Sequence, residues 1–151
     1  MKITLYQPDI AQNLGAAMRL CVCFGVPLAI IEPCGFPLTV KALRRTAMDY
    51  AAQVDVIRHK TWAGFADSEL NAGNRIVLLS TKAARPITNF KFKANDTLLF
   101  GRESAGVPDE IHGAVQERVF IPLNPDARSL NLVSSASIAL FEALRQTGGL
   151  K

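Results

Sequence analysis

Short apolar runs alternate with stretches of helical periodicity along the whole chain. Residues 3–6 alternate apolar and polar positions, as a short strand does, and this pattern ends before Pro8. Several later runs are apolar throughout, which is typical of strands buried on both faces of a parallel sheet. The strands predicted after the first cover residues 28–31, 54–57, 75–79, 97–100 and 119–121.

The segments between these strands carry helix signals. Asn13 is a suitable N-cap for a helix over residues 14–24, and Gly25 follows as its stop. Thr61 caps a later helix, and the inward face of that helix is expected to carry Trp62, Phe65 and Leu70. Further helices are predicted over residues 39–48, from Pro108 onwards, and from about Asn131 to Gln146.

This alternation predicts an α/β fold with a mainly parallel sheet flanked by helices. The chain has 151 residues, so we expect one domain over residues 1–151. Hydrophobic residues make up 49% and charged residues 20%, as in globular proteins. No apolar run reaches the roughly 18 residues of a membrane helix, and the first residues do not form a signal peptide. We therefore expect a cytoplasmic protein without membrane contact.

Basic residues are in excess and unevenly distributed. The net charge of +4 and the pI near 9.2 are compatible with a nucleic-acid partner, as they are with many others. Lys41, Arg44 and Arg45 gather on one predicted helix, which either contacts phosphate groups or faces solvent. Residues 82–93 contain no acid and are predicted to form a loop that carries Lys82, Arg85, Lys91 and Lys93.

The cysteines and histidines do not suggest a metal site. Cys21, Cys23 and Cys34 are best interpreted as buried, reduced thiols, because free cysteine packs as a small hydrophobe. Neither His59 nor His112 has cysteine or carboxylate partners at the spacing of metal ligands. We therefore expect no metal and no disulfide.

Two of the predicted strands run directly into turns of small and polar residues, over 101–106 and 121–132. Ligands of parallel α/β proteins bind at the carboxyl ends of strands, so we expect the two turns to form one cofactor pocket, which Arg19 faces. The segment Gly101-x-Glu103-x-x-Gly106 is not the dinucleotide motif, because its second position is acidic. Neither a Walker lysine nor a nucleophile elbow is present, so kinase, hydrolase and dehydrogenase classes lose their usual support.

Three motifs carry a resemblance to a known family. They are Asn13-Leu14-Gly15 with Arg19 and Cys21, then Phe100 to Gly106, then Ile121-Pro122 followed by Arg128 to Leu132. With these motifs the chain resembles, over its whole length, the SPOUT class of S-adenosylmethionine-dependent RNA methyltransferases. Within that class it is similar to the minimal enzymes that methylate the ribose 2′-hydroxyl of the tRNA wobble nucleotide, a cytidine or a modified uridine.

The resemblance implies a fold and partners that periodicity does not reveal. In this class the last strands and helix thread through a loop and form a C-terminal trefoil knot. The class forms homodimers, and the active site lies where the knot of one subunit meets the other. The resemblance also implies S-adenosylmethionine as the cofactor and the anticodon loop of tRNA as the partner.

The resemblance further assigns candidate site residues. The positions that match the family's cofactor contacts are Leu79, Gly101, Ile121 and Ser129, and Leu130 is a turn residue suited to the same pocket. The candidate catalytic residues are Arg19, Asn13, Glu103 and Asn131. A guanidinium is a very poor base, so we expect Arg19 to position a phosphate and lower the proton affinity of the hydroxyl. The candidate RNA-binding residues are Lys41, Arg44, Arg45 and Lys82.

Three positions depart from the family's pattern. Ala16 stands where asparagine is frequent, Arg102 where a small residue or proline is usual, and Phe141 where tyrosine is frequent. These departures leave the cofactor pocket intact and bear on the choice of nucleotide. Two alternatives stay open: a 2′-O-methyltransferase for another tRNA position or for ribosomal RNA, and a non-catalytic RNA-binding protein.

Overall fold

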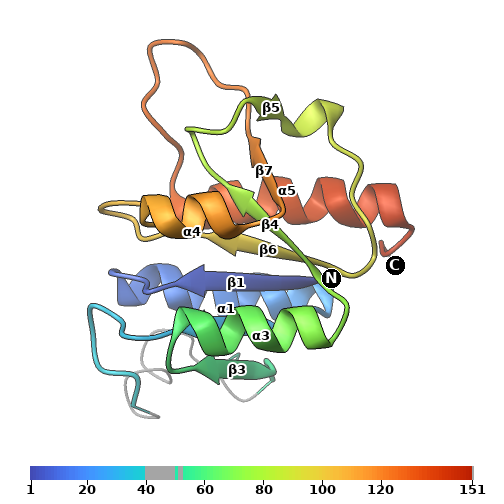
Figure 1. Ribbon diagram of the computed structural model, residues 1–151. Helices are drawn as coiled ribbons and strands as arrows, with labels where there is room; N and C mark the ends of the chain where they lie inside the picture. Colours follow the sequence, from blue (N-terminus) through green and yellow to red (C-terminus); the bar gives the residue numbers. More distant parts are fainter. Residues whose placement is uncertain (40–49, 51–52, 151) are drawn as a thin grey trace.

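The computed structural model describes residues 1–39, 50 and 53–150, which form a parallel sheet between two helical layers (Figure 1). Seven strands of the described chain follow the order β3-β2-β1-β6-β4-β7-β5, and all their pairings are parallel. The strands are β1 (Lys2–Tyr6), β2 (Leu28–Ile31), β3 (Val56–His59), β4 (Arg75–Leu79), β5 (Arg85–Pro86), β6 (Asp96–Phe100) and β7 (Glu117–Phe120). The helices are α1 (Ala11–Phe24), α3 (Trp62–Asn71), α4 (Asp109–Ala114), α5 (Leu132–Thr147) and the 3-10 helix η2 (Ile87–Asn89).

The alternation of side chains along the strands divides the core into two layers. Ile3, Leu5 and Leu98 pack in the layer that contains α1 and α5. Leu99, one residue after Leu98, faces the opposite way and packs with residues of α3 and α4. Figure 1 shows α1 and α5 behind the sheet and α3 and α4 in front of it. Both faces of the sheet are therefore covered, which explains the continuous apolar runs.

The sheet extends from β1 in both directions. β2 and β3 lie on one side of β1, whereas β6, β4, β7 and β5 lie on the other. Leu5 and Leu79 both pair with Phe100, so the carboxyl ends of β1, β4 and β6 are aligned. A sheet that reverses its winding direction leaves a crevice at such carboxyl ends, and ligands bind there.

Several predicted helix ends are confirmed. Gly25, the predicted stop of α1, adopts a left-handed backbone conformation with a φ of 65°, and so does Gly148 after α5, with a φ of 71°. Thr61 caps α3, and its side chain accepts a hydrogen bond from the N–H of Gly64 at 3.1 Å. No helix in the described part of the chain is long and apolar enough to span a bilayer.

Other expectations about the elements are wrong. The strands predicted over 54–57 and 119–121 lie at Val56–His59 and Glu117–Phe120, because pairing with β2 and β4 selects the register. Leu70 does not face inward; it is 68% exposed near the end of α3. Residues 82–93 are not wholly loop, since they contain β5 and η2. The helix predicted over 39–48 falls almost entirely on residues outside the described part.

Buried ion pairs close the amino ends of the central strands. Lys2 Nζ lies 2.5 Å from Glu69 Oε1, and the hydroxyl of Thr97 also donates to Glu69. Nε and Nη2 of Arg75 donate to the two carboxylate oxygens of Asp96, each at 2.7 Å. Glu69 and Asp96 are each 1% exposed, so both carboxylates depend on these partners.

Candidate cofactor and RNA site

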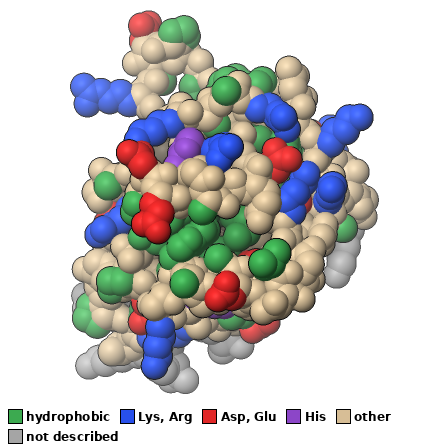
Figure 2. All heavy atoms as spheres, in the orientation of Figure 1, with side chains coloured by type: hydrophobic (Ala, Val, Ile, Leu, Met, Phe, Trp, Pro, Cys, Tyr) green, Lys and Arg blue, Asp and Glu red, His purple; other side chains and the backbone are tan. Residues whose placement is uncertain are grey.

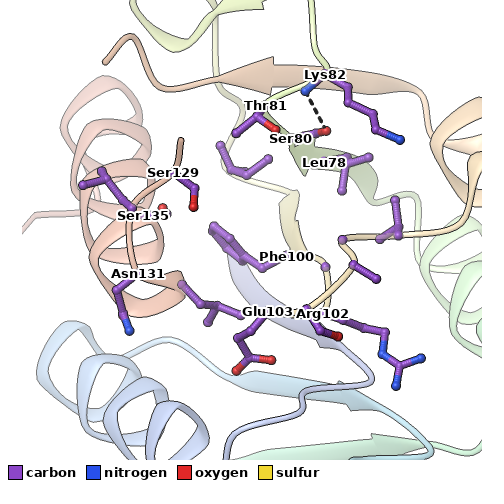
Figure 3. Close-up of a pocket in the computed structure, with 18 of the residues that line it drawn as sticks. Leu78, Ser80, Thr81, Lys82, Phe100, Arg102, Glu103, Ser129, Asn131 and Ser135 are labelled. Atoms are coloured by element: carbon purple, nitrogen blue, oxygen red, sulfur yellow. Dashed lines mark hydrogen bonds between the residues drawn. The ribbon is translucent and has the colours of Figure 1, made fainter. Parts of the chain in front are cut away.

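A pocket of about 650 Å³ opens at the carboxyl ends of β4, β6 and β7 (Figure 3). Both turns singled out in the sequence line it, so the expectation that they form one pocket is confirmed. Its lining includes the five predicted cofactor-contact residues, Leu79, Gly101, Ile121, Ser129 and Leu130. In Figure 3 the Phe100 ring lies in the middle of this lining, with Ser129 and Ser135 to one side of it.

The first turn is packed so closely that only glycine fits at Gly101. A Cβ there would lie 2.4 Å from the carbonyl carbon of Gly106. Arg102 and Gly106 exchange two backbone hydrogen bonds, of 2.9 and 2.8 Å, and Gly106 has a φ of 70°, which glycine adopts without strain. The two ends of the turn therefore lie against each other, and glycine at position 101 permits this close approach.

Three of the four candidate catalytic residues, Asn13, Glu103 and Asn131, form a chain of hydrogen bonds. Asn13 Nδ2 donates to Glu103 Oε1 at 2.9 Å, and Asn131 Nδ2 donates to Asn13 Oδ1 at 3.1 Å. Asn131 Oδ1 accepts from the N–H of Val133 at 2.8 Å and thereby caps α5. Figure 3 shows the Glu103 and Asn131 side chains directed to the same side, toward α1. α1 begins at Ala11, so Asn13 is not the predicted N-cap; it connects the two turns instead.

Sequence reasoning missed Asp9, which lies between β1 and α1. Its carboxylate accepts hydrogen bonds from the hydroxyl and N–H of Ser104 and from Arg102; these donors, Ser104 first, hold its pKa below the ordinary value. Arg102 therefore pairs with Asp9, and in Figure 3 its guanidinium points away from the pocket. The signal that could have found Asp9 is its place after a strand that ends at the same edge of the sheet.

Arg19 does not line the pocket of its own chain, contrary to the sequence-based expectation. It follows Asn13 by six residues on α1, which rotates it by roughly 240° about the helix axis. Its side chain is exposed, and its guanidinium carbon lies 5.2 Å from the centre of the Tyr50 ring, a cation–π contact. Arg19 therefore lies on a different side of α1 from Asn13, which lines the pocket.

The structure describes one of the four candidate RNA-binding residues. Lys82 lines the pocket, its side chain is 69% exposed, and its Nζ lies 3.5 Å from Asp109 Oδ1. Lys41, Arg44 and Arg45 lie outside the described residues. Figure 2 shows that Lys and Arg side chains gather in the upper half of the visible face, over the region of β5 and β7.

The three cysteines are free and differ in exposure. Burial raises the pKa of the Cys21 thiol to about 12 and that of the half-buried Cys34 thiol to about 11, so both stay protonated at neutral pH. Cys23, which was expected to be buried, is exposed on α1. Among the described residues no group of three His, Cys, Asp or Glu side chains is placed to hold a metal ion.

These observations define a parallel α/β protein with a pocket at the carboxyl ends of β4, β6 and β7. A family model described as SpoU rRNA Methylase family matches residues 1–141, and the chain belongs to this family. A relative from Beijerinckia indica subsp. indica, named tRNA (cytidine(34)-2'-O)-methyltransferase, is 52% identical over 148 residues, 98% of this chain and 92% of the relative. A relative of the same name from Escherichia coli (strain K12) is 37% identical over 150 residues, 98% and 94% of the two chains.

Solved structures agree with this assignment. One, described as "Structural insights into the 2-OH methylation of C/U34 on tRNA", has a TM-score of 0.89 and 36% identity, covering 96% of this chain and 94% of that chain. An AdoMet-bound rRNA methyltransferase from Sinorhizobium meliloti has a TM-score of 0.85 and 25% identity, covering 95% of this chain and 55% of that chain. The predicted α/β fold with a parallel sheet flanked by helices is confirmed.

Proposed function

We propose that this chain is an S-adenosylmethionine-dependent methyltransferase acting on the ribose 2′-hydroxyl of the tRNA wobble nucleotide, a cytidine or a modified uridine. The observation that carries the proposal is full-length similarity to relatives whose names state this activity, together with a pocket built from both turns. We further propose that residues 1–151 act as one methyltransferase domain, in the cytoplasm.

The pocket has the chemistry that S-adenosylmethionine requires. Leu79, Ile121 and Leu130 offer apolar walls to a flat adenine ring. Gly101 lines the cavity, and the turn that it begins is closed so tightly that a Cβ at this position would overlap Gly106. The pocket is thus suited to hold the cofactor, which supplies, when bound, a methyl group activated by its sulfonium charge.

The protein's own residues act on the ribose 2′-hydroxyl, which is the poorer reactant. They must align it and help its proton to leave. A guanidinium is a very poor base, so Arg19 acts by holding a neighbouring phosphate and lowering the proton affinity of the hydroxyl. Glu103, held by Asn13, lies on the pocket lining, where it orients the turns and the incoming ribose.

The resemblance to SPOUT proteins leads us to propose a C-terminal trefoil knot and a homodimer. An exposed stripe on α1 contains Ala16, Arg19 and Cys23, and an exposed stripe on α5 contains Ile138 and Phe141, which are 43% and 50% exposed. Burial of such apolar side chains against a second copy is favourable, and a twofold pairing would use the same stripes on both protomers. In this dimer Arg19 acts in the pocket of the partner protomer.

A methyltransferase for ribosomal RNA or another tRNA position is the second candidate, because the matching family model is described by ribosomal RNA. Against it, the chain spans 94% of the Escherichia coli relative, whose name specifies tRNA. An anticodon loop is a small RNA target with a defined shape, which a domain of this size can recognise.

Nucleoside mass spectrometry of tRNA from a strain that lacks the gene tests the proposal. We expect the 2′-O-methyl group of the wobble nucleotide to be lost, and to be restored by the gene but not by an Arg19→Ala copy. An unchanged wobble nucleotide with a methyl group lost elsewhere would support the second candidate. Calorimetry on the purified protein tests the enzyme class: no binding at millimolar S-adenosylmethionine would favour a non-catalytic RNA-binding protein.

A further inference from the structure

The main-chain N–H and both carboxylate oxygens of Asp9 contact the turn over residues 101–106. Its main-chain N–H donates to Glu103 Oε2 at 2.8 Å. Its Oδ2 accepts from the N–H and the hydroxyl of Ser104, at 3.2 and 2.5 Å. Its Oδ1 accepts from Nη2 and Nε of Arg102, at 3.2 and 3.3 Å. Asp9 therefore holds three consecutive residues of the turn, and Glu103 is the middle one.

The backbone around Asp9 is itself held from the other side. Gln7 has a φ of 44°, a left-handed conformation that is uncommon outside glycine, and its N–H donates to the carbonyl of Ile31 at 2.8 Å. The N–H of Gly35 donates to the carbonyl of Pro8 at 2.9 Å, and a Cβ on Gly35 would lie 3.0 Å from the Asp9 Cα. Asp9 is thus anchored to the sheet, and the turn is attached to Asp9.

The position of Glu103 determines the direction of the hydrogen bonds beyond it. An ionised carboxylate only accepts, so Asn13 presents its NH₂ group to Glu103 and its carbonyl oxygen to Asn131. Asn131 then donates its NH₂ group to Asn13 and keeps its oxygen for the N–H groups that begin α5. Glu103 at one end of this series of hydrogen bonds, and the first N–H groups of α5 at the other, both require the Asn13 and Asn131 amides to be oriented in this way. If Glu103 were displaced, only the N–H groups of α5 would still fix that orientation.

We propose that Asp9 is a positioning residue that acts through Glu103, holding it where it keeps Asn13 and Asn131 oriented beside the pocket. The reaction that this arrangement serves rests on the proposed function. Asp9 is not among the residues that line the pocket, so it acts without contact to a ligand bound there. The charged groups that face its carboxylate and its N–H are Arg102 and Glu103, respectively.

Asp9→Ala and Asp9→Asn test the proposal, with Asp67→Asn as the matched control, an exposed aspartate on α3. We expect kcat to fall about tenfold to hundredfold in Asp9→Ala, because a displacement of about 1 Å at a site can lower the rate about hundredfold. Asp9→Asn keeps some acceptor capacity and should lose less. The affinity for S-adenosylmethionine, measured by calorimetry, should change far less than kcat, and Asp67→Asn should change neither.

A Glu103→Ala background separates positioning from a general loss of structure. Because Asp9 acts through Glu103, Asp9→Ala should cause no further fall of kcat when Glu103 is already absent. An equal fall in both backgrounds would overturn the proposal, as would an unchanged kcat in Asp9→Ala alone.

Amide hydrogen exchange provides a readout that does not need the reaction. In Asp9→Ala we expect faster exchange at the N–H groups of Ser104 and Gly106, while exchange in β6 stays unchanged. Unaltered exchange in the turn would overturn the proposal. A wild-type protein that methylates no tRNA would contradict the proposed function instead, and the exchange result would still decide the role of Asp9.

Discussion

Buried carboxylates at the amino ends of the central strands have different partners from Glu103 at the carboxyl ends. At the amino ends, Glu69 and Asp96 are each 1% exposed and are paired with Lys2 and Arg75. At the carboxyl ends, the hydrogen-bond donors that the structure gives to Glu103 are neutral groups, a main-chain N–H and an asparagine amide. One end therefore balances buried charge with opposite charge, whereas the other keeps a carboxylate beside a pocket.

This difference suggests that the carboxylates at the amino ends contribute to stability, whereas Glu103 at the carboxyl ends contributes to the reaction. Burial raises the pKa of Glu69, but hydrogen bonds from Lys2, Thr97 and Asn74 outweigh burial and hold the pKa below the ordinary value. The folded state thus favours ionised Glu69, and the oxygens of this carboxylate are occupied by hydrogen bonds to its partners. We expect substitutions at the amino ends to reduce stability, and substitutions at the carboxyl ends to reduce binding or rate.

Lys2→Met has the largest expected effect, because it leaves the buried carboxylate of Glu69 without its cation. We expect the free energy of unfolding to fall by about 3 kcal/mol, at the lower end for a broken buried pair, since Thr97 and Asn74 still donate to Glu69. Urea unfolding at a fixed protein concentration measures the loss. The kcat per folded molecule should stay unchanged.

Acid and a surface lysine provide controls for this variant. The stabilising contribution of Glu69 is present above its unfolded pKa and is lost as the pH falls toward its lower folded pKa. The stability difference between wild type and Lys2→Met should therefore narrow in acid. Lys91→Met, at an exposed position, should change stability by less than about 0.5 kcal/mol. A lower kcat with unchanged stability in Lys2→Met would contradict the view that the amino ends of the strands serve stability alone.

Gly101→Ala tests the carboxyl ends. The added methyl group would lie 2.4 Å from Gly106, so the turn must shift. We expect S-adenosylmethionine binding to weaken by about 2 kcal/mol, or about thirtyfold in Kd by calorimetry. Gly113→Ala is the control, because a Cβ at this α4 position meets nothing within 4 Å. Equal affinities in the two variants would show that the turn does not shape the pocket.

The strands and the pocket were predictable because their signals are local. The run over residues 76–79 is apolar whatever surrounds it, and the turn over 101–106 follows its strand directly. The start of α1 was not predictable from Asn13, which has the chemistry of an N-cap. Its amide is engaged instead by Glu103, 90 residues away in the sequence, and this long-range contact overrides the local preference.

The role of Asp9 depends on a contact that local patterns do not encode, and the place of Arg19 depends on helix geometry that a motif alone does not state. Asp9 contacts Glu103 across 94 residues of sequence, and neither residue's surroundings predict this pairing. Arg19 belongs to the predicted first motif, but the motif does not say that Asn13 and Arg19 lie on different sides of α1. Because Asn13 and Arg19 are close in sequence, the motif suggested that both face one pocket, but they lie on different sides of the helix.

Substitutions of Asn131 separate its two functions. Asn131→Ala removes the N-cap of α5 and should lower stability by about 1 kcal/mol, whereas Asn131→Asp keeps the capping oxygens and should be nearly neutral. Both variants lose the NH₂ group that donates to Asn13, so both should lower kcat, by about tenfold for one lost hydrogen bond. Urea unfolding and steady-state kinetics measure the two effects. Full activity in Asn131→Asp would show that the hydrogen-bond chain is dispensable.

The exposed pair of Glu142 and Arg145 on α5 should give the smallest effect. Hydrogen bonds from Arg145 and Gln146 lower the pKa of Glu142 to about 2. The contribution of Glu142 to stability is therefore present above its unfolded pKa of about 4.3 and is lost as the pH falls from there toward about 2. The Arg145 and Glu142 side chains are 58% and 24% exposed, so water screens the pair and Arg145→Gln should lower stability at neutral pH only slightly. An NMR titration should show a higher pKa for Glu142 in this variant.

If Arg145→Gln destabilised the protein more than Lys2→Met, burial would not determine the strength of these pairs, and the contrast between the two ends of the sheet would lose its physical basis.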